Sequence, residues 1–138
     1  MRIFLLIQAL VLGAFHAYSL SAIRDKAIDR SVEFEEMFNA LGKTDLVEQK
    51  VFLIRTTRWM SLLFLPYCVF SMTYFLRSGF PWVITAGFVT MVVTDYSFSL
   101  KKIKLAKTLE EAISVTLLDR IILWVTFVLL AIQVSILL

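Results

Sequence analysis

Four long apolar runs dominate the sequence and constrain its fold more strongly than any motif does. They cover residues 3–23, 59–76, 81–100 and 121–138. Each run approaches the roughly 20 apolar residues that a helix needs to cross a bilayer. The spaced, alternating segments that mark a membrane β-barrel are absent. We therefore expect an all-α membrane protein that crosses the bilayer with four helices.

The composition supports this expectation. Of the 138 residues, 59% are hydrophobic, and the mean hydropathy is +0.82. A small soluble domain buries too small a fraction of its surface to hide so many apolar side chains, so lipid must cover part of them. Four glycines and two prolines leave few breaks, which favours long helices. The chain is therefore expected to form a single membrane domain.

Positive charges are concentrated in two of the connections between the runs. Segments 24–58 and 101–120 hold all of the 14 Lys and Arg residues except Arg2 and Arg77. By the positive-inside rule, connections rich in Lys and Arg stay on the cytoplasmic side. We therefore expect both segments to be cytoplasmic and both chain termini to lie on the opposite side of the membrane.

Segment 24–58 has the pattern of two helices joined by a turn. A spacing of i, i+3, i+4 and i+7 indicates one apolar helical face, formed by Phe34, Met37, Phe38 and Leu41. Gly42 follows, and glycine commonly ends helices. We expect a cytoplasmic helical hairpin that turns near Gly42. Two roles are open for its apolar stripe: it packs within the hairpin, or it contacts a soluble or membrane partner.

Segment 101–120 differs because its start is strongly basic. Four lysines cluster there, at Lys101, Lys102, Lys104 and Lys107. Such clusters bind anionic lipid headgroups, although the alternative is that these lysines act only as a topology signal. Thr108 and Glu111 match a T-x-x-E capping box. We expect a helix that begins at Leu109 and continues into the last apolar run without a break.

Small residues recur every four positions in the first and third runs. The first ridge comprises Ala9, Gly13, Ala17 and Ser21, and the second comprises Ala86, Thr90 and Thr94. Small residues allow helix backbones to approach each other closely in a membrane. The ridges predict that the first and third membrane helices pack together, or that one ridge joins copies of the chain.

Two amides and two ionisable side chains within the runs are candidates for buried interactions. Gln8 and Gln133 both lie near the outer face, so we predict a hydrogen bond between them. His16 and Asp95 are expected at similar depths. Ionisable groups are costly in lipid and therefore suggest function, and a carboxylate beside an imidazole can bind a cation or relay protons. Alternatively, Asp95 is an interfacial or structural residue near the inner edge.

The sequence carries no catalytic or cofactor motif. Its single Cys and single His argue against a Cys-cluster or multi-His metal site, and no glycine-rich phosphate loop is present. We therefore expect neither enzyme activity nor a cofactor, metal or nucleic-acid partner. The leading hypothesis is a small accessory or regulatory subunit of a larger membrane protein complex. The alternative is a homo-oligomeric channel or proton-coupled carrier that uses His16 and Asp95.

Overall fold

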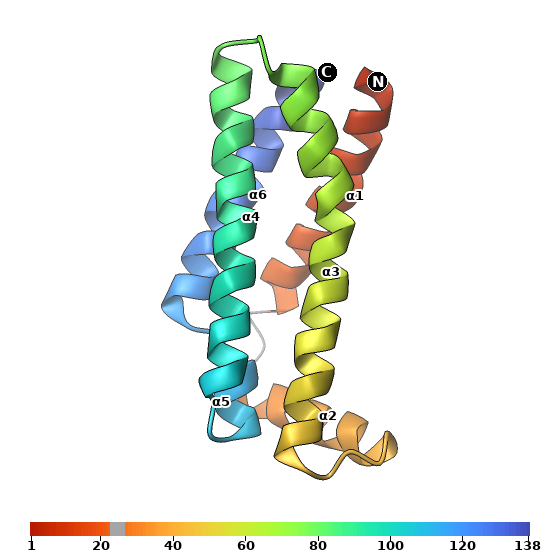
Figure 1. Cartoon of the computed structure of the whole chain (residues 1–138), viewed down its shortest axis with the longest axis vertical. Coiled ribbons are helices and arrows are strands. Elements are labelled where there is room, and N and C mark those ends of the chain that lie inside the picture. The colour runs from red at the N-terminus through yellow and green to blue at the C-terminus, as the bar shows by residue number, and fades with distance from the viewer. Residues whose placement is uncertain (23–26) are drawn as a thin grey trace.

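The computed structural model describes residues 1–22 and 27–138, and these form helices joined by short connections, with no strand in either range. Four of the described helices have 21 residues or more. They lie side by side, and both chain termini lie at the same end of this bundle (Figure 1). The helices in chain order are α1 (Arg2–Ala22), α2 (Ala27–Ala40), α3 (Leu46–Phe75), α4 (Phe80–Leu105), α5 (Leu109–Ile113) and α6 (Leu117–Leu137).

Three helical segments in the described part of the chain are long and apolar enough to cross a membrane. They are Arg2–Leu20, Phe80–Leu105 and Leu109–Leu137, the last comprising α5 and α6. The prediction of four membrane-spanning helices is therefore wrong by this measure, and residues 59–76 form the run that does not qualify as a span. That run lies in α3, which ends at Phe75 and contains Pro66. Because α3 ends before Leu76, a stretch of spanning length within this helix must include Arg58, and that charged residue lowers the mean hydropathy of the stretch.

A Schellman motif ends α2 at the predicted glycine. Gly42 has a φ of 68°, a left-handed conformation that side chains other than that of glycine disfavour. The Gly42 amide donates to the Asn39 carbonyl at 3.0 Å, and the Lys43 amide donates to the Phe38 carbonyl at 2.8 Å. Both bonds are those of the motif. The turn near Gly42 is as predicted, but α2 lies across the end of the bundle instead of running along α3 (Figure 1).

The segment after α4 contains a break that we did not predict. Thr108 begins α5 as expected, accepting a hydrogen bond from the Glu111 amide, but α5 ends at Ile113 and a new helix begins after Thr116. The Asp119 amide donates to Thr116 Oγ1 at 3.2 Å, while the Thr116 amide donates to Asp119 Oδ2 at 2.7 Å. This second capping box starts α6, and it explains why the expected continuous helix is divided.

The two ends of the chain are joined by a side chain at the terminal end of the bundle. Arg2 Nε donates to the Leu137 carbonyl at 2.7 Å, and a second guanidinium nitrogen donates to the Leu138 carbonyl. The last carbonyls of a helix have no partner within it, so Arg2 satisfies two of those of α6. This contact holds α1 beside α6.

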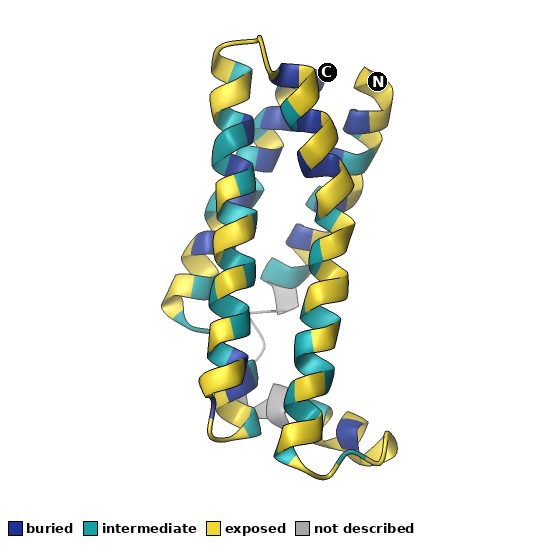
Figure 2. Ribbon diagram, in the orientation of Figure 1, coloured by how far each residue is buried: buried dark blue, intermediate teal, exposed yellow. Residues whose placement is uncertain are grey.

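Buried residues of α1, α3, α4 and α6 form one core cluster, and exposed positions recur along each of these helices (Figure 2). α3 packs most closely on α4, and α6 packs on both α1 and α4. Large apolar side chains on the outer surface are numerous. A surface of this kind is what a helical bundle presents to lipid, which solvates apolar side chains as well as a protein core does. The core residues include Leu5, Ala9, Leu12, Tyr67, Phe75, Phe88, Leu130 and Leu137.

Candidate functional site: a cavity between α1, α3, α4 and α6

A buried hydrogen-bond network links three helices near the terminal end of the bundle. The Tyr67 hydroxyl donates to Gln133 Oε1 at 2.9 Å, and Gln133 Nε2 donates to Thr85 Oγ1 at 2.9 Å. Tyr67, Thr85 and Gln133 are all fully buried. The predicted bond between Gln8 and Gln133 is therefore not formed, because two closer partners from α3 and α4 satisfy Gln133. The Gln8 Oε1 atom is buried without a hydrogen-bond partner among the described residues.

The small-residue ridge of α1 packs on α6, not on α4 as we predicted. Ala9 is fully buried. Gly13 faces Leu130 of α6 so closely that a Cβ atom added there would lie 3.8 Å from Leu130 Cδ2. Ala17 is exposed, and the side chain of Ser21 lies outside the described part of the structure. The ridge thus contributes to packing only over its first half.

The second ridge is directed away from the core. Thr90 and Thr94 are exposed, and each hydroxyl donates at 2.8 Å to the carbonyl four residues earlier. Ala86 is half-buried. Gly87, one residue further along, approaches Leu129 of α6 instead. The predicted pairing of the two ridges therefore does not occur within one chain.

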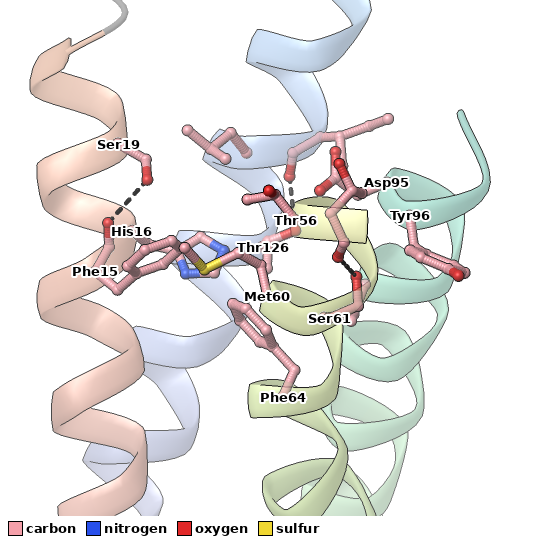
Figure 3. Close-up of a pocket in the computed structure, with 14 residues that line it drawn as sticks. Phe15, His16, Ser19, Thr56, Met60, Ser61, Phe64, Asp95, Tyr96 and Thr126 are labelled. Carbon is pink, nitrogen blue, oxygen red and sulfur yellow. Dashed lines mark hydrogen bonds between the residues drawn. The ribbon is translucent and has the colours of Figure 1, made fainter. Parts of the chain in front are cut away.

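His16 and Asp95 line the same cavity, which has a volume of about 200 Å³ (Figure 3). Thr56, Ser61 and Phe64 of α3 and Thr126 of α6 also line it. His16 is almost fully buried, whereas Asp95 is half-buried. The structure thus places the two predicted ionisable residues at one site, although no hydrogen bond or ion pair joins them among the described residues.

The imidazole of His16 is oriented by its own helix. Nδ1 lies 3.1 Å from the Leu12 carbonyl oxygen, and a carbonyl oxygen can only accept a hydrogen bond. Nδ1 therefore carries a proton, and in the neutral ring Nε2 is an acceptor. The ring also packs edge-on against Phe64 of α3, with a centroid distance of 5.4 Å. These two contacts fix the ring within the cavity wall.

A second hollow of about 370 Å³ adjoins the first at the lysine-rich end of the bundle. Asp95, Phe15, Ser19 and Leu123 line both, so Asp95 stands between them. The second hollow also contains Lys102, whose ammonium group lies 2.8 Å from Asp119 Oδ2 and 2.8 Å from the Ser114 carbonyl. Its charge is therefore already paired. The carboxylate of Asp95 has no comparable partner within the described residues.

The four lysines predicted to contact headgroups have different environments. Lys102 is half-buried and holds the α5–α6 connection against α4 through Asp119, so its role is structural. Lys101, Lys104 and Lys107 are exposed. For these three, contact with anionic lipid stays a prediction.

The apolar stripe of α2 is partly used within the chain. Phe38 is fully buried, with ring centroids 6.2 Å from Phe34 and 5.6 Å from Phe52 of α3. Met37 and Leu41 remain exposed. Of the two roles that the sequence left open, packing within the chain accounts for the phenylalanines, and only the other two residues are available for a partner.

Sequence reasoning identified Gln133 as a buried hydrogen-bonding residue but missed its partners Tyr67 and Thr85, and it also missed Thr126, which lines the cavity. Thr126 and Gln133 are both buried on α6 and are separated by seven residues, a spacing that places them on one helical face. Two polar side chains on one stripe of an otherwise apolar helix were the available signal. Thr56 and Ser61 of α3 gave no comparable signal, because they precede or enter the apolar run among other polar residues.

Comparison with known proteins gives no relative for this chain: no family model matches it, and neither a curated protein nor a solved structure is significantly similar. The argument for function therefore rests on the site itself.

Proposed function

We propose that the protein is a small multi-pass accessory or regulatory subunit that binds a larger membrane protein. The observation that carries this proposal is an exposed apolar surface outside the three candidate spans. It comprises Met37, Leu41, Val47 and Val51, with exposed fractions of 36, 51, 65 and 60%. These residues belong to α2, the turn and the start of α3. In the topology proposed below, these residues lie at the cytoplasmic end of the bundle, outside the hydrocarbon layer, and exposed apolar residues there favour a protein partner.

The proposed topology places all four long helices in the membrane. Although α3 is less apolar than the others, it lies beside α4 along the bundle (Figure 1). Large apolar side chains cover its outer surface, namely Leu62, Leu63, Leu65, Val69, Phe70 and Leu76. Water would be a poor solvent for that surface. The lysine-rich end then faces the cytoplasm and both termini face the opposite side.

The interaction proposal is tested by extracting the full chain from its own membrane in a mild detergent and measuring the mass of the particle. The double variant Val47→Asp/Val51→Asp is compared with Glu48→Gln, a change at a neighbouring exposed position on the same helix. We expect the wild type and Glu48→Gln to run as a complex and the double variant to run as the free chain. A wild-type chain that is monomeric at its natural abundance contradicts the proposal.

The second candidate function is a channel or proton-coupled carrier formed by several copies. The observation that favours it is the shared cavity of His16 and Asp95, since one carboxylate and one imidazole there could exchange protons or hold a cation. Proton and cation flux into liposomes containing the purified chain, compared with Asp95→Asn, tests it. Flux that is absent, or that is unchanged in the variant, removes this candidate.

A further inference from the structure

The described residues that line the cavity shared by His16 and Asp95 include one carboxylate, that of Asp95, and several hydroxyl groups. None of these described lining residues is Lys or Arg. Lys102 of the adjoining hollow is paired with Asp119. Arg58 lines a neighbouring hollow that shares Ser61 and Tyr96 with the cavity. A ligand with positive charge would meet the Asp95 carboxylate, which forms no ion pair among the described residues.

Three of the hydroxyl groups that line the cavity already donate their hydrogens within their own helices. Ser19, Ser61 and Thr126 each donate their hydroxyl hydrogen to the carbonyl four residues earlier, at 3.0, 2.9 and 2.7 Å. A hydroxyl has one hydrogen to donate but two lone pairs. Because the hydrogens of Ser19, Ser61 and Thr126 are used within the helices, these three hydroxyls offer only lone pairs to a ligand. The Nε2 atom of a neutral His16 adds another acceptor.

Aromatic side chains form the apolar part of the same wall. Phe15 and Phe64 contact each other edge to face, with ring centroids 6.2 Å apart, and Tyr96 lines the cavity beside Asp95. Aromatic faces attract ammonium groups through the ring quadrupole. The volume of about 200 Å³ exceeds the roughly 150 Å³ of an engineered protein cavity that holds benzene. A ligand with a ring or a short alkyl chain therefore fits.

A metal ion fits this lining less well. One carboxylate and one imidazole supply fewer strong ligands than a structural or catalytic zinc site uses, and the described residues contain no group of three or more His, Cys, Asp or Glu side chains that could hold a metal. Neutral acceptors and aromatic walls are instead the surroundings of organic ammonium ions.

We propose that the cavity binds a small organic cation, with its ammonium group beside Asp95 and the acceptors of Ser61 and Thr126, and its hydrocarbon part against Phe15 and Phe64. This inference gives a ligand class to the site of the second candidate function and rests on that site. It does not require transport. Binding and flux are measured separately, so a chain that binds the cation without moving it would refute the carrier and leave the binding site standing.

The test measures binding of benzylamine, which is protonated at neutral pH, to the full chain in detergent micelles by calorimetry. Benzyl alcohol serves as the neutral probe of similar shape, and protein-free micelles correct for partitioning. We expect saturable binding of benzylamine to one site per chain and binding at least ~10-fold weaker for the alcohol. Truncating one partner of a buried charged pair commonly costs more than such a factor.

Two pairs of variants locate the site. Asp95→Asn should weaken benzylamine binding at least ~10-fold, whereas Glu110→Gln, which removes a carboxylate at an exposed position on α5, should change it by less than about 2-fold. Thr126→Val removes one cavity acceptor with little change of shape and should weaken binding by about 3–10-fold. Thr90→Val removes an equivalent exposed hydroxyl outside the cavity and should have no effect.

Three outcomes overturn the proposal. One is the absence of saturable benzylamine binding to the wild-type chain. Another is equal binding of benzylamine and benzyl alcohol, which would make the cavity a simple apolar pocket. The third is an affinity that neither Asp95→Asn nor Thr126→Val lowers. Because Thr126→Val preserves side-chain shape, it decides the question even where Asp95→Asn fails to fold.

Discussion

Replacing Tyr67 by phenylalanine perturbs the buried network by a single oxygen atom. The Tyr67 hydroxyl donates to Gln133 Oε1 at 2.9 Å where both side chains are fully buried. Without that hydroxyl, the amide oxygen loses its partner in a place that water does not reach. An unpaired buried acceptor costs ~1–3 kcal/mol in soluble proteins, while hydrogen bonds between membrane helices average about 0.6 and reach about 1.7 kcal/mol. We expect Tyr67→Phe to lower the free energy of unfolding by about 1 kcal/mol.

The assay is equilibrium unfolding in mixed micelles of a mild and a denaturing detergent, followed by circular dichroism. Tyr74→Phe is the matched control, because Tyr74 lies on the same helix but is 38% exposed. Combining Tyr67→Phe with Gln133→Leu should cost less than the sum of the two single changes, since the second loss removes the orphaned acceptor. The reasoning would be refuted if the free energies of unfolding of Tyr67→Phe and Tyr74→Phe differed by less than about 0.3 kcal/mol, since a difference that small is not resolved between two independent single changes.

Three further predictions concern the connections and the α1–α6 contact. Lys102→Gln should speed amide hydrogen exchange in the α5–α6 connection, because it removes the ion pair with Asp119. Lys101→Gln, a change at an exposed position, should leave exchange unchanged. Mass spectrometry of the exchanged peptides measures both. Gly42→Ala should lower the free energy of unfolding by ~1 kcal/mol, because alanine disfavours the φ of 68° at this position. Crowding adds nothing, since no atom lies within 4 Å of the added methyl group. Gly42→Asn should lower the free energy of unfolding less in the same assay, because asparagine tolerates this conformation better. Gly13→Ala should change the free energy of unfolding by less than about 0.5 kcal/mol, because the new Cβ makes only an ordinary van der Waals contact at 3.8 Å. A loss of stability above about 2 kcal/mol, which is typical of an overpacked core, would show that α1 and α6 lie closer together than this.

Features set by local chemistry could be predicted from the sequence. The end of α2 at Gly42 follows from the conformational freedom of glycine, and the start of α5 follows from the capping pattern of Thr108. Both features depend only on residues within a few positions of the helix end. The division of the last helix was equally local, because Thr116 and Asp119 form a second cap. We missed it because the apolar run beyond it suggested continuity.

Features set by contacts between distant helices could not be predicted in the same way. A ridge of small residues shows that a helix can be approached closely, but any neighbouring helix satisfies it, and α6 occupies the ridge of α1. Similarly, Gln133 needed a partner in the core, and the sequence offers several. Tyr67 and Thr85 are its partners because α3 and α4 approach α6 at that level. His16 and Asp95, which were predicted at similar depths, line one cavity, although no hydrogen bond or ion pair joins them among the described residues.

The central claim is that the long helices cross a membrane with both charged connections on one side. Membrane-impermeant maleimide labelling of single cysteines tests it most directly, in a background where Cys68→Ala removes the natural thiol. Lys43→Cys lies in the turn before α3, Ser78→Cys lies in the turn after it, and Lys104→Cys lies near the end of α4. Positions 78 and 104 are exposed, and position 43 is half-buried. Sealed vesicles of known orientation should label residues 43 and 104 from the cytoplasmic side and residue 78 from the opposite side. Labelling of residues 43 and 78 from the same side would contradict the account, because α3 would then not cross.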